Sequence, residues 1–294
     1  MKIGAFQLTD PVPECNEPYV LAILKPWIDV NNVASLLLDE LEARLGADEL
    51  ARLSRPGLFY DFTRYRPIIH LEEGIQDMSV PNTTIHYVKR EGKNDLLLLR
   101  LLEPHAQSEL YIGSVLKVLR KFNAKKYILL GSMYDTVPHT RPLIVSGYGM
   151  GESAQRDIAR AGVLPIIYNG PSTIANLITK EAALSGIDAA AFIVSLPQYV
   201  VMEEDHAGKV RLMEVLNMLY DIPVGDEDFE KARQQRSLIS ERLKGSPELV
   251  ALLPQLENAY DTRVKAALGE GAADLGPEME DIFWKIMGKD IGKA

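Results

Sequence analysis

The sequence predicts an α/β fold, in which a mostly parallel sheet is followed by a helical extension. Up to residue 224, strand-like apolar runs alternate with segments of helical periodicity, which is typical of α/β proteins. Polar and proline residues gather where the predicted strands end. From about Gly225 the strand-like runs disappear and charged residues become frequent. We therefore divide the chain into an α/β core, residues 1–224, and a helical extension, residues 225–294.

The composition is that of a soluble globular protein. The 294 residues are 47% hydrophobic and 25% charged, with a formal net charge of −9. An acidic chain argues against nucleic-acid binding, because that requires a basic surface. No apolar run approaches the roughly 18 residues that a membrane span needs, and the N-terminus lacks the apolar core of a signal peptide. The single cysteine, Cys15, excludes an intrachain disulfide, so we expect a cytoplasmic protein.

The first predicted unit is a strand, a polar turn and a helix. The strand covers residues 19–24, after a proline-punctuated surface segment. Asn31 or Asn32 can cap the helix that follows, and Gly46 ends it. The apolar residues of this helix share one face: Val33, Leu36, Leu37, Leu41 and Leu45.

Several strand-like runs come next. They cover residues 58–63, 68–71, 83–88 and 95–102. The run at 83–88 alternates like a half-buried strand, whereas the run at 95–102 is almost entirely apolar. We expect the latter to be a central strand that is covered on both faces. A helix over residues 107–122 leads to the next strand.

The strand that begins at Lys126 is expected to turn at Gly131 and to continue into a loop bounded by Pro138 and Pro142. Each proline fixes its own φ and restricts the residue before it, so the loop should be stiff. Ligands of open α/β sheets collect just beyond the carboxyl ends of the strands. The loop residues here are Asp135, His139, Thr140 and Arg141.

We call residues 139–141 the arch. Arg141 offers a planar fork of donors, so the arch suits an anion or a carbonyl group. It equally suits a structural corner, because most polar side chains in loops bond nearby backbone groups. The sequence leaves both interpretations open.

The rest of the core alternates strands and helices. Residues 146–151 contain three glycines and are interpreted as a flexible turn, because a dinucleotide loop would need an acidic residue at a fixed spacing. Ser153 could cap the helix after this turn, and Ser172 or Thr173 could cap a later one. The remaining elements are a strand at 164–168, a helix at 174–184, a strand at 189–194 and an amphipathic helix at 210–219.

The extension is predicted to be helical. Its helices cover residues 229–243 and 246–268, with Pro254 inside the second. A final helix carries apolar residues on one face, namely Ile282, Phe283, Ile286 and Met287. The extension either packs on the core or serves as an arm in oligomerisation. Its expected contact residues are Phe229, Leu256 and Tyr260.

We expect one cluster of polar and turn residues at a single edge of the sheet, because each of them follows a predicted strand. Its members are Asp29, Asn31, Glu103, His105, Asp135, Pro138, His139, Thr140, Arg141, Gly170 and Pro171. We assign no catalytic residue, no metal ligand and no cofactor. His70 and His86 are interpreted as structural, and the acidic run 203–206 as the start of a helix rather than a metal site.

Six segments, taken in order, resemble the proteasome assembly chaperone-2 family over about residues 20–224. They are Trp27-Ile-Asp29-Val-Asn31-Asn-Val-Ala-Ser35, Phe59-Tyr-Asp61-Phe-Thr63-Arg-Tyr-Arg66-Pro67, Glu103-Pro104-His105, Val137-Pro138-His139-Thr140-Arg141-Pro142, Tyr168-Asn-Gly170-Pro171 and Pro197-Gln198-Tyr199. The resemblance implies a three-layer α/β/α fold like that of nucleoside phosphorylases and related hydrolases. The helical extension resembles the one on longer, actinobacterial-type members.

The sequence departs from the family pattern in three places. Ser172-Thr173 stands where many members have Thr-Gly, and Gln198 stands where many have histidine. Chaperones of this family that dock on the proteasome often end in a hydrophobic residue, a tyrosine and one more residue. This sequence ends in Asp290-Ile-Gly-Lys-Ala294, so docking through such a tail is not expected, although a proteasome-related partner stays possible.

The resemblance favours a non-catalytic assembly chaperone or scaffold that binds proteins and forms a homo-oligomer. The alternatives are a hydrolase or phosphorylase-like transferase, or a small-ligand-binding protein, that uses the same loops. In an enzyme, Asp135 would orient a base, His139 would be the acid/base and Arg141 would clamp an anion. No serine-centred nucleophile elbow, metal-ligand spacing or phosphate loop supports catalysis.

Overall fold

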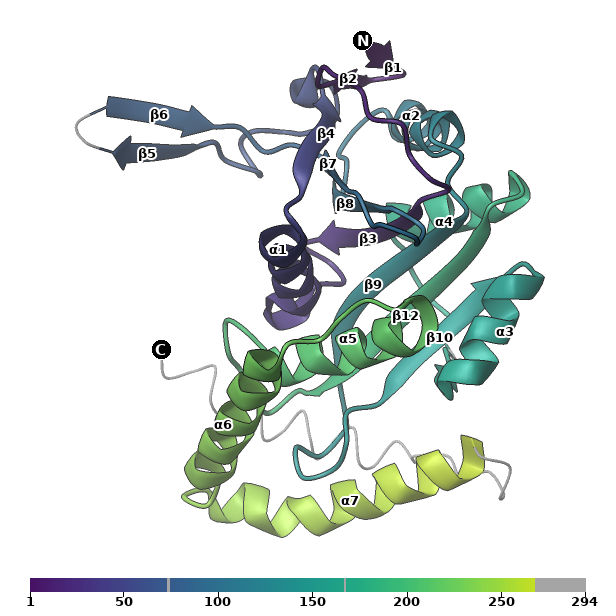
Figure 1. Ribbon diagram of the computed structural model, residues 1–294. Coiled ribbons are helices and arrows are strands. Elements are labelled where there is room, and N and C mark those ends of the chain that lie inside the picture. Colours follow the sequence, from purple (N-terminus) through teal and green to yellow (C-terminus); the bar gives the residue numbers. More distant parts are fainter. Residues whose placement is uncertain (73–74, 167, 268–294) are drawn as a thin grey trace.

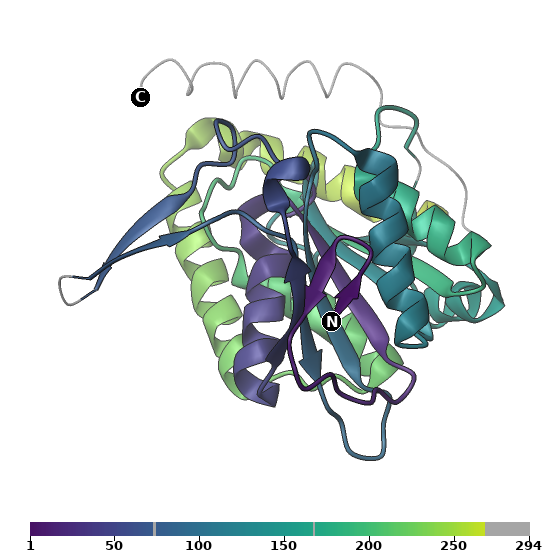
Figure 2. The same cartoon turned by 90° about the horizontal axis from the view of Figure 1, so that it is seen from above.

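The computed structural model describes residues 1–72, 75–166 and 168–267 (Figure 1). The predicted final helix and the chain end at Ala294 therefore lie outside the described residues. Helices cover both faces of a central sheet, and two further helices follow at the end of the described chain (Figures 1 and 2). The predicted α/β class with a helical extension is confirmed.

Ten strands of the described residues form the main sheet, in the order β1-β2-β4-β7-β8-β3-β9-β12-β10-β11. They are β1 (Lys2–Ile3), β2 (Phe6–Leu8), β3 (Tyr19–Lys25), β4 (Asp48–Leu53), β7 (Thr84–Val88), β8 (Leu96–Leu102), β9 (Lys126–Asp135), β10 (Val145–Met150), β11 (Leu164–Pro165) and β12 (Asp188–Pro197). The central strands β8, β3, β9 and β12 are parallel. Antiparallel pairs extend the sheet from both sides of this centre, so the whole sheet is mixed.

The core helices divide between the two faces of the sheet. They are α1 (Val33–Leu45), α2 (Ser108–Lys121), α3 (Glu152–Ala161), α4 (Ile174–Leu184) and α5 (His206–Tyr220). Helices α2 and α4 pack on one face, and α1, α3 and α5 on the other. The two sides of β9 show the consequence, since Tyr127 and Leu129 join the first core whereas Ile128 and Leu130 join the second. A strand covered on both faces needs a continuous apolar run, as observed.

Strand β9 does not turn at Gly131 as predicted but continues to Asp135. The segment that follows β3 pairs in parallel with the strand at this point, and the Ser132 N–H donates to the Ile28 carbonyl oxygen at 2.8 Å. A Cβ at position 131 would lie 2.5 Å from that oxygen. Glycine is therefore required for a close approach of two backbones, not for a turn.

The glycine-rich residues 146–151 form a strand, β10, up to Met150, rather than the predicted flexible turn. A Cβ at Gly147 would lie 2.5 Å from the Ala191 carbonyl oxygen of β12. A Cβ at Gly149 would lie 2.6 Å from backbone atoms of Ala154 in α3. The glycines thus let β12 and α3 approach β10, which explains them without a phosphate ligand.

The predicted strand at residues 58–63 is wrong. A short 3-10 turn, Pro56–Leu58, comes first, and the Asp61 carboxylate then accepts a bond from the Thr63 N–H at 2.8 Å. Local bonds of this kind compete with strand pairing. The neighbours Phe59 and Tyr60 are both buried, which the alternation of a strand on one sheet face does not allow.

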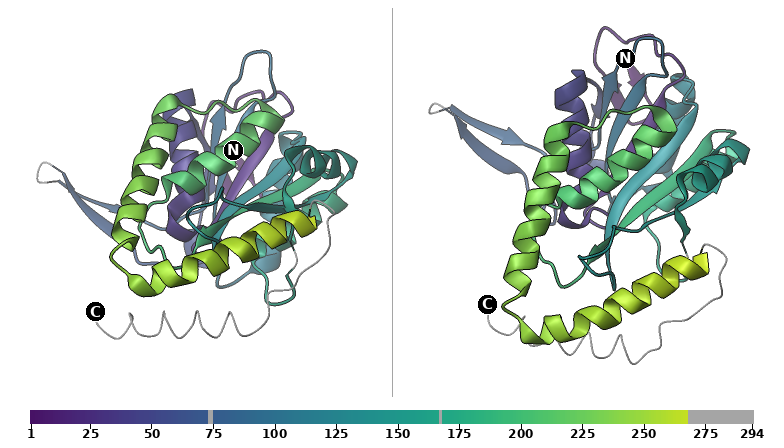
Figure 3. Two further views of the ribbon diagram at one scale, coloured as in Figure 1. Left: turned by 90° about the horizontal axis from the view of Figure 1, so that it is seen from below. Right: turned by 60° about the horizontal axis from the view of Figure 1, so that its bottom comes forward.

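Two strands outside the main sheet form a hairpin. Strand β5 (Ile68–Glu72) pairs with β6 (Ile75–Ser79) in antiparallel register. The hairpin extends away from the body of the molecule in every view (Figures 1, 2 and 3). Only β5 was predicted from the sequence.

The extension contributes helices α6 (Asp226–Leu243) and α7 (Pro247–Ala267). Helix α6 packs on α5. Helix α7 then passes along the edge at which β9 and β12 end (Figures 1 and 3). None of the helices described here is both long and apolar enough to cross a membrane.

Candidate functional site

The parallel centre of the sheet brings the carboxyl ends of β3, β8, β9 and β12 to one edge. The predicted polar residues lie along this edge, but their contacts divide them into three groups and a separate residue, His105. One group begins α1, a second begins α4, and the third meets α7.

The first group is a helix cap. The Asp29 carboxylate accepts bonds from the Ala34 N–H at 2.8 Å, the Ser35 N–H at 3.2 Å and the Ser35 hydroxyl at 2.5 Å. It therefore satisfies donors of the first turn of α1. Asn32 occupies the N-cap position, but its side chain donates to the Glu203 carbonyl, and Asn31 accepts from the Tyr134 hydroxyl. The predicted asparagine cap is wrong, because the Asp29 carboxylate, which precedes the N-cap position in the chain, accepts the bonds of the first turn instead.

The second group begins α4. The Glu103 carboxylate accepts a bond from the Ile174 N–H, with its two oxygens 3.0 and 3.3 Å from that nitrogen. Burial raises the pKa of Glu103, while this hydrogen bond opposes the rise. Thr173 stands at the N-cap position without capping through its own side chain. Glu103 thus links the end of β8 to the start of α4, near the Gly170–Pro171 turn, where Tyr168 donates to the Pro171 carbonyl at 3.0 Å.

His105 holds the segment in front of the hairpin. Its Nδ1 accepts a bond from the Asp61 N–H at 3.2 Å, and its ring packs against Tyr65 with centroids 4.7 Å apart. His105 therefore has a structural role, although it belongs to Glu103-Pro104-His105, one of the segments that carry the family resemblance.

The third group is the arch, which forms hydrogen bonds and ion pairs with α7. The His139 N–H donates to the Tyr199 hydroxyl at 2.7 Å, and His139 Nδ1 lies 2.9 Å from the same oxygen. Because the hydroxyl accepts the first bond, it has its own proton to donate to Nδ1. Burial lowers the pKa of His139, helped by Arg236 and opposed by Glu257. Burial raises the pKa of Tyr199 to about 12, so its proton stays in place.

Thr140 and Arg141 bind two carboxylates of α7. The Thr140 hydroxyl donates to Glu257 at 2.5 Å. Arg141 forms a bidentate pair with Asp261, both distances being 3.1 Å, and its Nη1 lies 3.3 Å from Glu257. Tyr260 adds a bond to the Pro142 carbonyl at 2.8 Å. Both carboxylates that pair with Arg141 thus belong to α7, and neither Asp135 nor Glu103 of the same edge is its partner.

Asp135 has other partners. Its Oδ2 accepts bonds from the Ser195 hydroxyl at 2.8 Å and from Arg263 of α7 at 2.6 Å. Its Oδ1 accepts from the Thr136 N–H at 2.7 Å. Pro138, between Asp135 and the arch, is buried. Four side chains of α7 therefore bind this edge, namely those of Glu257, Tyr260, Asp261 and Arg263. The sequence predicted none of the ion pairs that they form.

The arrangement is a joint between the sheet edge and α7. Its charges are paired with one another, and its histidine is bonded to a tyrosine of the same edge. The other polar features also have structural contacts, since His70 lies 2.9 Å from the Ser79 hydroxyl and Asp205 caps α5 through the Gly208 N–H at 2.7 Å. Within the part of the chain that the structure describes, no group of three metal-ligating side chains could hold a metal ion.

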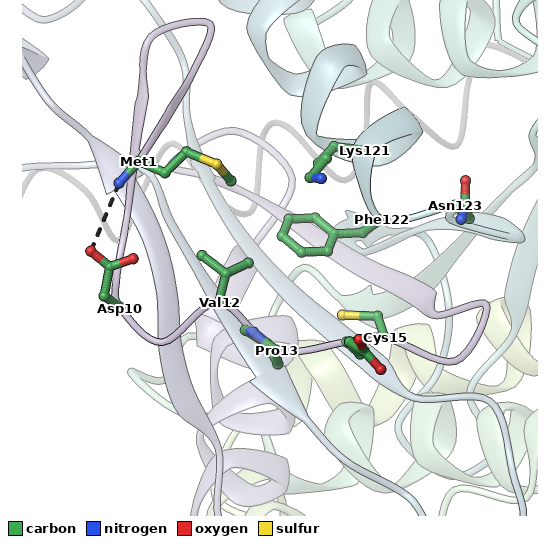
Figure 4. Close-up of a pocket in the computed structure, with 9 residues that line it drawn as sticks. Met1, Asp10, Val12, Pro13, Cys15, Lys121, Phe122 and Asn123 are labelled. Carbon is green, nitrogen blue, oxygen red and sulfur yellow. Dashed lines mark ion pairs between the residues drawn. The ribbon is translucent and has the colours of Figure 1, made fainter.

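A surface cavity of about 640 Å³ lies away from this edge, between the N-terminal segment and the end of α2 (Figure 4). Its lining comprises Met1, Asp10, Val12, Pro13, Glu14, Cys15, Lys121, Phe122 and Asn123. Burial, reinforced by Asp95, raises the pKa of Cys15 to about 12, so the thiol is not activated. No residue of the predicted cluster reaches this cavity.

Exposed apolar side chains also lie at the carboxyl edge. Trp27 is 64% exposed, and Met133, near the end of β9, is nearly half exposed. The backbone around Trp27 is tied on both sides, because the Lys25 carbonyl accepts from the Glu103 N–H at 3.1 Å and the Ile28 carbonyl from Ser132. The edge thus presents a firmly held aromatic side chain to solvent.

Comparison with known proteins agrees with the fold. The profile of the PAC2 family matches residues 23–243. A protein of unknown function from Corynebacterium glutamicum superposes with a TM-score of 0.78 at 21% identity, covering 90% of this chain and 99% of its own. No protein with a curated description matches the sequence.

Two further solved structures have names that refer to the proteasome. A proteasome-assembly chaperone homologue from Mycobacterium tuberculosis gives a TM-score of 0.71 at 24% identity, covering 79% of this chain and 98% of that chain. An archaeal proteasome activator from Pyrococcus furiosus gives 0.61 at 15% identity, covering 82% and 99%. At these identities the likeness establishes the fold.

Proposed function

The chain belongs to the PAC2 family, and we propose on that basis that it is a non-catalytic assembly chaperone or scaffold. It binds protein partners and works in the cytoplasm as a homo-oligomer. The names of the proteasome-related structural neighbours make unassembled proteasome subunits the first clients to test.

The observation that carries this proposal is the exposure of Trp27 on a firmly held turn. Tryptophan is enriched among the residues that dominate protein interfaces, because it buries a large area with little loss of conformational entropy. Met133 adds a flexible apolar side chain near the end of the next strand, and methionine adapts to differently shaped partners. Exposed apolar side chains at this edge suit a protein partner rather than a small molecule.

The pairing of the polar side chains at the same edge also supports the proposal. His139, Arg141 and Asp135 bind Tyr199, Asp261 and Arg263, as described above. A general base needs a free path to the proton that it removes, and an anion clamp needs donors that face a ligand. Arg141 and Asp135 instead connect the core to α7, and His139 is bonded within the edge of the core.

The test is binding and assembly with unassembled subunits. Unassembled proteasome subunits of the native host, and any subunit captured from its lysate, are titrated with the wild type and with Trp27→Ala. We expect Trp27→Ala to bind about 30-fold more weakly, since an interface residue of this kind typically contributes about 2 kcal/mol. We also expect the wild type to speed formation of the finished complex, followed on native gels.

Leu184→Ala is the matched control. Leu184 is also highly exposed, but it lies at the C-terminal end of α4, whose N-terminus faces the carboxyl edge. The control should bind clients like the wild type. Equal binding by Trp27→Ala, or recognition of finished complexes alone, would contradict the proposal.

A further inference from the structure

We propose that α7 is a displaceable strap, and that the surface beneath it is a docking site for an acidic, amphipathic helix of a partner protein. This surface comprises the arch, Asp135 and Tyr199, and we call it the arch surface. It is separate from Trp27 and does not depend on the chaperone role. Helix α7 covers it along the carboxyl edge of the sheet (Figures 1 and 3).

The arch surface is held in shape by the core. The prolines on either side of the arch stiffen its loop. The His139 N–H donates to the Tyr199 hydroxyl at 2.7 Å. At the other end of the surface, the Ser195 hydroxyl donates to Asp135 at 2.8 Å. None of these four residues belongs to α7, so the surface should keep its form when α7 is displaced.

Helix α7 shows which kind of helix fits this surface. The side chains that it uses are two leucines, two carboxylates and an arginine, namely Leu252, Leu256, Glu257, Asp261 and Arg263. The two leucines lie one helical turn apart, and so do the two carboxylates. The leucines pack with Tyr199, the carboxylates accept bonds from the arch, and the arginine donates to Asp135. A partner helix with this order of apolar, acidic and basic side chains would be recognised in the same way.

The contacts that hold α7 can be exchanged for others. Its two leucines form a small apolar cluster of their own, apart from the two cores that flank the sheet. Its ion pairs are open to water, since Asp261 is 42% exposed and Arg141 and Arg263 are each 33% exposed. Pairs of this kind contribute little to stability. Displacing α7 therefore opens neither of the main cores.

A short turn joins the strap to α6. The Gly245 N–H donates to the Arg242 carbonyl at 3.3 Å. The Ser246 N–H donates to the Leu243 carbonyl at 3.0 Å. Both bonds return to the last turn of α6, so they do not tie the strap to the core. Helix α7 can therefore swing outwards while α6 stays anchored through Asp228.

The short turn also decides which occupant can replace α7. It keeps α7 close to its own surface, at a high effective concentration. The α7 helix of a second copy has the same side chains without that advantage, so exchange between copies is not favoured. A partner protein that also contacts another part of this molecule has a comparable advantage, because its helix is then tethered as well.

The experiment supplies α7 in trans to the full chain. The probe is a fluorescein-labelled peptide of residues 246–267, and fluorescence anisotropy measures its binding. The two receptors are the wild type and a double variant, Glu257→Gln with Asp261→Asn, which weakens the strap and leaves the arch intact. We expect the double variant to bind the peptide about tenfold more tightly, because apparent affinity rises with the fraction of molecules whose surface is free.

Two controls separate docking from a general loosening of the chain. A peptide with the same two substitutions lacks the carboxylates that the arch recognises, so the double variant should bind it about tenfold more weakly than the native peptide. Adding Arg141→Ala to the double variant should abolish most of this difference between the two peptides. Circular dichroism and melting curves verify that every receptor folds.

Two results would overturn the proposal. One is a double variant that binds neither peptide, even at millimolar concentration. The other is equal binding of both peptides by the double variant, which would mean that the arch does not select carboxylates. Every receptor keeps Trp27 and no client is used, so this result and that of the client titration are independent.

Discussion

At the scale of single residues, the arch shows how a polar motif can be structural. Arg141 sits in a stiff loop, as the prolines around it imply, and its guanidinium is aimed accurately. Its target is a pair of carboxylates one helical turn apart on α7, Glu257 and Asp261. The donor fork of arginine thus serves an internal contact rather than an external anion.

We predict that Arg141→Ala loosens α7 without unfolding the core. The Arg141 side chain is one-third exposed, so water replaces its bonds to the carboxylates once it is removed. Hydrogen exchange of the amides around Tyr260 should become severalfold faster, while the melting temperature changes little. Arg233→Ala, an exposed arginine that pairs with Glu230 of its own helix, is the control and should leave α7 unchanged. A large fall in melting temperature would show that the arch supports the core itself.

A second prediction concerns the pH dependence that His139 contributes. Its pKa is lower in the folded than in the unfolded protein, so the unfolded state binds more protons as the pH falls. The free energy of unfolding should therefore decrease below about pH 6.5, the ordinary value for histidine, and lose this contribution fully once the folded group also titrates. Urea unfolding between about pH 7.5 and 5 measures it.

The comparison for this measurement is His139→Gln, which does not titrate in that range. The pKa of His206 is also lowered, first by burial and then by Lys209, but His206 is present in both proteins. The difference between the two slopes therefore isolates His139. Identical slopes would mean that folding does not change the pKa of His139.

At the scale of elements, a buried ion cluster anchors α6 to the core. Asp228 of α6 accepts bonds from Lys209 of α5 at 2.5 Å and from Arg44 of α1 at 2.7 Å. Burial acts to raise the pKa of Asp228, but the two cations bring it below its ordinary value. Lys209 is almost completely buried, and Asp228 is the nearer of its two carboxylate partners, the other being Glu40 at 3.7 Å.

We predict that Asp228→Asn lowers the free energy of unfolding by about 3 kcal/mol, because it removes the carboxylate 2.5 Å from the buried Lys209 ammonium and leaves Glu40, 3.7 Å away, as its counter-charge. Urea unfolding with tryptophan fluorescence measures the change. The matched control is Glu230→Gln, an exposed carboxylate two residues further along α6, which should change stability by less than about 0.5 kcal/mol. A similar decrease in the free energy of unfolding of both variants would contradict the role assigned to Asp228.

At the scale of the whole molecule, the two helices of the extension are attached with different strength. Helix α6 is held by the buried cluster around Asp228. Helix α7 buries Leu252 and Leu256, with Tyr199 packed beside them, and its other ties to the core are half-exposed polar contacts. Phe229, which we had expected to make a contact, is exposed in this chain. The boundary between a core of residues 1–224 and an extension stays a prediction.

Two truncations should reveal the difference. A chain that stops after Lys244 loses α7, and we expect its core to keep a melting temperature within a few degrees of the wild type. A chain that stops after Val224 also loses Asp228, the nearer counter-charge of the buried Lys209, and should be less stable. Calorimetry of both proteins measures this, and equal melting temperatures would contradict it.

The sequence by itself determined those features that depend on local constraints. Central strands need continuous apolar runs because both faces are buried, so β3, β8, β9 and β12 were predictable. Helix ends follow local chemistry, and Gly46 ends α1 in the left-handed conformation as expected. The ordered motifs identified the family, and the parallel centre of the sheet then brings the predicted residues to one edge.

Only the tertiary structure decided what those residues do. Thr140 and Glu257 are 117 residues apart, and no local rule connects an arch to a helix at that distance. From the sequence, Gly131 and Gly147 suggested turns. In the structure they are glycines because a Cβ at either position would lie 2.5 Å from the carbonyl oxygen of a neighbouring backbone, and only the packing of the elements reveals that neighbour. The exposure of the β5–β6 hairpin could not be predicted for the same reason. Burial depends on which elements pack together, and the sequence of a hairpin does not show which elements lie beside it.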